Sequence, residues 1–271
     1  MGVLLGAARR PGPARRLPQH AAARRGGRVS GPLGRRVAAE AVGTGLLVAV
    51  VVGSGIQAAE LSRDVGVQLL ANSLATVFGL AVLITLLGPV SGAHFNPAVT
   101  LTAWFAGRRG GTGPNLREGL AYVLAQLGGA VGGAVLANAM FAEPLVKFST
   151  HDRSAGHLWL GEVVATAGLV LVIFGLERIG RAALAPTAVA CYIGAAYWFT
   201  SSTSFANPAV TVGRAFTDTF AGIAPTSLAP FIAAQLLGAA LGLAAVTLVY
   251  GRPARTADVV VPHGEPELAS S

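Results

Sequence analysis

The chain contains two copies of the tripeptide Asn-Pro-Ala, at Asn96-Pro97-Ala98 and Asn207-Pro208-Ala209. These are its strongest candidates for a functional role. Asn is a favoured N-cap and Pro a favoured first helical residue, so each motif predicts the start of a helix. Glycines and charges follow soon after each motif (Arg108 and Arg214), which limits each helix to roughly 7–10 residues, or ~10–15 Å. Two half-length helices at corresponding places in an apolar chain indicate a transport site between inverted repeats.

The two Asn side chains are the chemical groups of that site. As N-caps, Asn96 and Asn207 would spend their side-chain oxygens on backbone N–H groups. Their amide hydrogens would then be fixed donors toward a permeating oxygen atom. If the positive ends of both helix dipoles pointed at one place, they would repel protons and cations there. The alternative is that the motifs are only well-capped helix starts.

Composition indicates a membrane protein. Of the 271 residues, 53% are hydrophobic and 12% charged, which is not the profile of a soluble domain. Five uncharged runs are long enough to cross a bilayer, and a sixth becomes so if extended back to residue 158. These runs are residues 41–59, 65–94, 119–142, 163–176, 182–212 and 220–251. The net charge of +8 is interpreted as basic loops of a membrane protein, so the lipid bilayer is the expected partner and nucleic acid is not.

The chain repeats itself. Each half contains a Glu at the start of a span, then Asn-Pro-Ala, then a Gln inside a later span: Glu40 and Gln126 in the first half, Glu162 and Gln235 in the second. Three spans per half reverse the direction of the chain, so the repeat is predicted to be inverted. We expect a channel domain at 35–250 with repeats 35–142 and 156–250, between a disordered basic tail at 1–34 and a second tail at 251–271.

Basic residues predict the orientation. If both termini are cytoplasmic, only four of the 20 Lys and Arg residues fall on the outer side, as the positive-inside rule requires. These four are Arg63, Lys147, Arg153 and Arg214. Small residues four apart, which let helices approach closely in lipid, predict packing faces at three pairs. The pairs are Gly128 with Gly132, Gly129 with Gly133, and Gly238 with Gly242.

The paired motifs, the preceding Ser91-Gly92-Ala93-His94-Phe95, the Glu-x-x-Gly-Thr opening at Glu40 and the twofold repeat resemble the aquaporin (major intrinsic protein) channel family over roughly residues 35–250. The resemblance implies an all-α membrane protein with six transmembrane helices and two half-helices in an inverted repeat, forming a homotetramer in the plasma membrane. It further implies that carbonyls of Gly92, Ala93 and His94 form an acceptor ladder along the pore. It gives Glu40 and Glu162 the role of anchoring the loops, against the alternative of proton coupling.

Selectivity departs from the family pattern. Most members carry an Arg directly after the second motif, in the narrowest ring of the pore, and here that position is Val210. The other ring positions, carried over by alignment, are Phe78, Ala195 and Ser204. Small side chains at Ala195 and Val210 should widen the ring and remove its positive charge. Arg214 is expected at the outer end of the second half-helix, without replacing that charge.

Residues 199–225 resemble a bacterial subgroup associated with arsenic resistance. This implies passage of uncharged metalloid acids, namely arsenous acid and methylated arsenicals. The sequence thus predicts a passive channel for small uncharged solutes, including small polyols. A water or glycerol channel is the first alternative. A coupled transporter, with Glu40, Glu162 and His94 as its titratable groups, is an alternative of another class. No nucleophile–base pair or metal-ligand cluster is apparent, so we expect no enzyme activity, cofactor or metal.

Overall fold

The structure, a computed structural model, describes residues 31–108 and 113–251. The two predicted tails therefore lie almost wholly outside the described residues. The described chain is helical, and the six predicted membrane-crossing helices are confirmed. Their bounds are α1 Leu33–Leu61, α2 Val65–Ser91, α4 Leu116–Met140, α5 Gly156–Arg178, α6 Ala185–Phe199 and α8 Leu228–Tyr250. Single 3-10 turns (Ala182–Leu184 and Pro225–Ser227) continue the spans of α6 and α8 at their starts.

The outer surface of these helices is apolar, which suits hydrocarbon rather than water. Large side chains such as Leu124, Leu237 and Leu248 are exposed. Polar side chains are found instead in the interior, where Glu40, Glu162 and many Thr, Ser, Asn and Gln residues are buried. The interior thus combines an apolar core with buried polar groups, and these polar groups could line a polar path through the bundle.

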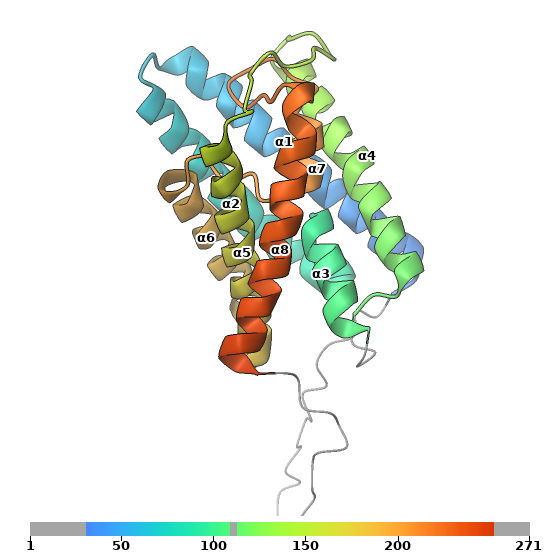
Figure 1. The fold of residues 1–271 in the computed structure, drawn as a ribbon. Helices are drawn as coiled ribbons and strands as arrows, with labels where there is room; N and C mark the ends of the chain where they lie inside the picture. Colours follow the sequence, from blue (N-terminus) through green and yellow to red (C-terminus); the bar gives the residue numbers. More distant parts are fainter. Residues whose placement is uncertain (1–30, 109–112, 252–271) are drawn as a thin grey trace, which may run out of the picture.

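The chain starts and ends at the same end of the bundle. Figure 1 shows α1, in blue, beginning and α8, in red, ending at the lower end, which we call the terminal end. The opposite loop end carries residues 62–64, 141–155 and 215–224. These segments join α1 to α2, α4 to α5, and α7 to α8.

Two short helices occupy the places where Asn-Pro-Ala predicted them. They are α3 (Pro97–Gly107, 11 residues) and α7 (Pro208–Arg214, 7 residues). From its motif α3 leads toward the terminal end, where α4 begins, whereas α7 leads into the loop-end segment 215–224. The two half-helices therefore run from the middle of the bundle toward opposite ends, and the predicted inverted arrangement is confirmed.

Glycines allow two close helix pairs, one in each half. An added Cβ at Gly129 or Gly133 of α4 would collide with backbone carbonyls of α1, and at Gly238 or Gly242 of α8 with carbonyls of α5. Two of the three predicted pairs thus lie at helix contacts. The third is different, because Gly128 and Gly132 are exposed and an added Cβ there meets nothing within 4 Å.

Candidate functional site

The two motifs meet in the middle of the bundle through crossed hydrogen bonds. Asn96 caps α3 by accepting from the backbone N of Ala98, and Asn207 caps α7 by accepting from Ala209 and Val210. Asn96 Nδ2 donates to the carbonyl of Ala206 at 2.7 Å, and Asn207 Nδ2 donates to the carbonyl of Phe95 at 2.7 Å. A side-chain amide has two N–H donors, so each Asn keeps one hydrogen for a solute. The sequence had predicted that both amide hydrogens would be free.

The loops before the motifs have the same unusual backbone in both halves. Ala93 and Phe95 have φ values of 49°, and their counterparts Ser204 and Ala206 have 52° and 47°. Each such non-glycine residue costs on the order of 1 kcal/mol or more. The conformation therefore requires external support, and in both loops a buried carboxylate supplies hydrogen bonds.

Glu40 and Glu162 are fully buried and accept from the loop backbones. Glu40 accepts from the backbone N atoms of His94 and Phe95, at 3.0 and 2.7 Å, and from Ser91 Oγ. Glu162 accepts from the backbone N atoms of Phe205 and Ala206, both at 2.8 Å. All these contacts use the carboxylates as acceptors, in the geometry that a loop-anchoring role needs.

A Gln and a Thr complete each anchor. Gln126 Nε2 donates to Glu40 at 2.7 Å and to Thr100 Oγ1 at 2.9 Å. Gln235 Nε2 donates to Glu162 at 2.7 Å and to Thr211 Oγ1 at 2.8 Å. Each network joins a long helix, a loop and a half-helix, so it fixes the motif relative to the bundle.

A cavity of about 1170 Å³ passes both motifs. It extends from residues at the terminal end, such as Arg108 and Arg178, to Arg214 near the loop end. One part of its lining is apolar and comes from pairs of residues four apart on four helices. These are Leu47 and Val51 of α1, Leu80 and Ile84 of α2, Leu169 and Ile173 of α5, and Val189 and Ile193 of α6.

The loops supply the polar part of the lining. Gly92, Ala93 and His94 line the cavity, and none of their carbonyls accepts a hydrogen bond from the described residues. Ser204 and Phe205 line it from the second loop, again with unpartnered carbonyls within the described chain. The Ser204 hydroxyl is buried without a partner. The cavity therefore offers carbonyl acceptors beside the two Asn donors, facing an apolar surface.

Two of the four predicted ring residues lie elsewhere. Phe78 is 66% exposed on the outer surface, and Ala195 is also exposed; neither lines the cavity. Thr76 and Tyr197 line it instead, and their hydroxyls lie 3.1 Å apart. Both corrections are shifts of two residues, and two residues turn a helical side chain by about 200°, to the opposite face.

The other two predicted ring residues, Ser204 and Val210, line the cavity, with Val210 5% exposed. Arg214 is the last residue of α7, at its outer end as expected. It is 4% exposed and lines both the main cavity and a smaller pocket of about 210 Å³ at the loop end. The signal that could have located it is helical spacing, because residue 214 is one turn beyond residue 210 on the same face of α7.

Comparison with known proteins agrees with this architecture. Residues 29–206 match the family described as Major intrinsic protein. The chain is 49% identical over 237 residues to Aquaglyceroporin AqpS of Rhizobium meliloti, covering 88% of this chain and 97% of the relative. It is 31% identical to the glycerol uptake facilitator protein of Pseudomonas aeruginosa, covering 79% of this chain and 88% of the relative. The X-ray structure of the aquaglyceroporin from Plasmodium falciparum shares the fold, with a TM-score of 0.58 at 22% identity, covering 82% and 96% of the two chains.

Proposed function

Because this chain belongs to the major intrinsic protein family of membrane channels, we propose that it is a passive channel for small uncharged polyhydroxy solutes. Glycerol and arsenous acid are the first candidates, followed by methylated arsenicals. The proposal rests on the cavity, whose lining is polar on one side and apolar on the other. Its donors, Asn96 and Asn207, and the unpartnered carbonyls before each motif lie in the same cavity as eight apolar side chains.

A two-sided lumen matches the chemistry of these solutes. A polyol has hydroxyl groups that can exchange hydrogen bonds with Asn donors and carbonyl acceptors, and C–H groups that suit an apolar wall. Arsenous acid presents three hydroxyl groups and is uncharged at neutral pH. Desolvation is expensive for a polar group only when its hydrogen bonds are not replaced, so the polar part of the lining lowers the barrier for either solute.

Residues Thr76, Tyr197, Ser204 and Val210 are proposed as the selectivity ring. With Val in place of Arg, this ring keeps three hydroxyl groups (Thr76, Tyr197 and Ser204) and has no cation of its own. Hydroxyl groups can both donate and accept, which fits a solute that also carries hydroxyls. The names of two relatives, an aquaglyceroporin and a glycerol uptake facilitator, agree with a polyol as solute.

The test is solute uptake by proteoliposomes containing the wild type or Val210→Arg, with water flux measured by stopped-flow light scattering. We expect the wild type to pass glycerol and arsenous acid well above protein-free vesicles. The substitution should reduce both fluxes at least about tenfold, because a long cation enters the ring. A matched control is Val212→Arg, whose residue lies on another face of α7 and does not line the cavity. Fast water flux without glycerol or arsenous acid flux, unchanged by Val210→Arg, would leave a water channel instead.

The channel is proposed to lie in the plasma membrane as a homotetramer, with both termini cytoplasmic. The common location of both chain ends follows from the bundle, and the excess of basic residues at the terminal end favours its cytoplasmic side. Accessibility of an engineered cysteine at Ser62, at the loop end, to an impermeant thiol reagent in whole cells tests this orientation, with Cys191 replaced by Ala. Labelling only after lysis would show that the loop end is cytoplasmic and would contradict this orientation.

A further inference from the structure

A basic residue that the ring does not include lies at the loop end of the cavity. Arg214 lies one helical turn beyond Val210 on α7 and lines both the main cavity and the loop-end pocket. It is the residue that these two spaces have in common. A solute that passes from one space to the other therefore meets the side chain of Arg214.

The guanidinium group of Arg214 is held in place by two contacts. Its Nε donates to the carbonyl of Ala221, and its Cζ lies 3.4 Å from the centroid of the Phe205 ring. Phe205 is buried and packs edge-on against Phe231, with centroids 5.3 Å apart. A guanidinium has five N–H donors, and among the described residues only Nε has an acceptor. The terminal NH₂ groups remain available to solutes.

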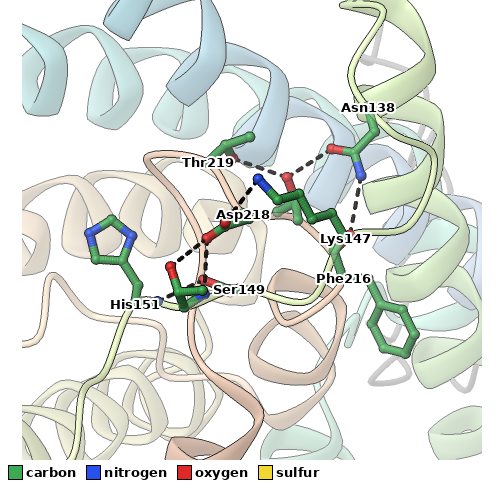
Figure 2. A network of polar contacts seen from close by, with 9 residues as sticks. Asn138, Lys147, Ser149, His151, Phe216, Asp218 and Thr219 are labelled. Atoms are coloured by element: carbon green, nitrogen blue, oxygen red, sulfur yellow. Dashed lines mark hydrogen bonds and ion pairs between the residues drawn. The ribbon is translucent and has the colours of Figure 1, made fainter.

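The segment that holds Arg214 is itself fixed by a polar network at the loop end (Figure 2). Asp218 forms an ion pair with Lys147 and accepts from the backbone N of Thr150. Asn138 donates to the carbonyl of Phe216, and Thr217 donates to Asn138. These contacts connect residues 215–219 to α4 and to the segment after it. The carbonyl of Ala221 is therefore presented by an ordered segment, and the position of the charge is fixed.

Within the described residues no carboxylate forms an ion pair with Arg214, although the buried carboxylate of Glu162 lies close enough to interact electrostatically with it. The ion pairs found within residues 31–108 and 113–251 are Arg36–Glu118 and Lys147–Asp218, and neither includes Arg214. Apart from Arg214, the loop-end pocket contains Arg153 and His151 and no acidic residue. A fixed, unpaired positive charge beside a narrow path repels cations and can donate to solute oxygens.

We propose that Arg214 is a specificity-determining residue, which supplies at the loop-end constriction the positive charge that Val210 does not carry. The channel then excludes protons and organic cations at Arg214, while the ring itself stays free of charge. This inference rests on the proposed channel function. Arg63 is the natural control, because it is an exposed basic residue at the same end of the bundle and lines neither space.

The experiment compares uptake of methylammonium, a cation, with uptake of glycerol in the same proteoliposomes. In the wild type we expect glycerol flux and no methylammonium flux above protein-free vesicles. Arg214→Val should raise the ratio of methylammonium to glycerol flux at least about tenfold, since a unit charge within several ångström contributes more than that factor in a partly buried site. Arg63→Val should leave the ratio at the wild-type value. The double variant V210R/R214V, which moves the charge back by one turn, should restore exclusion.

A second pair of variants covers the case in which Arg214→Val does not fold. Arg214→Lys and Arg214→Gln both keep a donor toward Ala221, and only the Lys variant keeps the charge. Methylammonium exclusion by Lys but not by Gln supports the proposal, and equal exclusion by both overturns it. Loss of glycerol flux in both reconstituted variants would make Arg214 a structural residue and also overturn it. Absence of glycerol flux in the wild type contradicts the channel proposal itself, and this inference with it.

Discussion

The two halves of the molecule share one construction and differ in what surrounds it. Residues Glu40, Gln126 and Thr100 in the first half make the same hydrogen bonds as Glu162, Gln235 and Thr211 in the second. The crossed Asn bonds, the positive φ values and the glycine contacts are also duplicated. What recurs in both halves is therefore the scaffold that holds two strained loops against each other.

The difference lies in one aromatic pair of each half. In the first half His94 packs edge-on against Tyr122, which accepts from Arg36. In the second half the corresponding pair is Phe205 and Phe231, and Arg214 and Arg153 lie over Phe205. The first half thus has an aromatic pair with its own hydrogen bonds and one cation, Arg36, over Tyr122, whereas the second has an apolar pair with two cations over Phe205. The contacts that both halves share build the pore, and the aromatic pairs that differ give its two ends different chemistry.

The largest effect is expected at the carboxylate anchors. Glu40→Ala and Glu162→Ala each leave two backbone N–H groups without an acceptor and remove one of the two acceptors of a Gln side chain. Each buried donor left unsatisfied costs about 1–3 kcal/mol, so both variants should lose several kcal/mol and melt at a clearly lower temperature in detergent. Equal losses would support the equivalence of the halves. If one variant melted like the wild type, the carboxylates would not be equivalent anchors.

A somewhat smaller effect is expected at the helix contacts. Gly129→Ala and Gly238→Ala should each cost roughly 1–3 kcal/mol, because the added methyl group meets a facing backbone carbonyl in both halves. Gly128→Ala is the control, since nothing lies within 4 Å of its added Cβ and Ala is the better helix former. In thermal unfolding, Gly129→Ala and Gly238→Ala should melt at lower temperatures than Gly128→Ala. If Gly128→Ala were destabilised, Gly128 would have to be in a close contact, which contradicts its role as the control.

The smallest effect is expected at the loop end, where Asp218 has no counterpart in the other half. Hydrogen bonds from the Thr150 backbone and the Lys147 side chain lower the pKa of Asp218 to about 2. A carboxyl whose pKa is lowered by folding stabilises the protein above its unfolded pKa, and the contribution is lost as pH falls toward 2. Asp218→Asn should therefore cost at most ~1 kcal/mol at pH 7, and nothing near pH 2.

Melting temperatures at several pH values measure this loss. Glu143→Gln, which alters an exposed carboxylate at the same end of the bundle, should match the wild type throughout. An Asp218→Asn deficit that is the same at pH 7 and near pH 2 would show that its cause is not the charge of Asp218.

The sequence was sufficient for the scaffold because each part has a local signature. Asn followed by Pro specifies a capped helix start, and uncharged runs specify the spans. It was not sufficient for the ring, since the side chains at Phe78 and Ala195 depend on the length of the connecting loops, and an error of two residues reverses their direction. The burial of Arg214 could not be predicted for another reason. Its partner Ala221 lies beyond the end of α7, in a segment whose path depends on tertiary contacts.

The most direct test of a continuous pore is the temperature dependence of glycerol uptake by the wild type, measured together with counterflow from glycerol-loaded vesicles. A pore predicts a weak dependence, close to that of free diffusion, and no stimulation by glycerol inside. A steep dependence with strong stimulation would show a conformational cycle, which is the behaviour of a carrier and contradicts the channel proposed here.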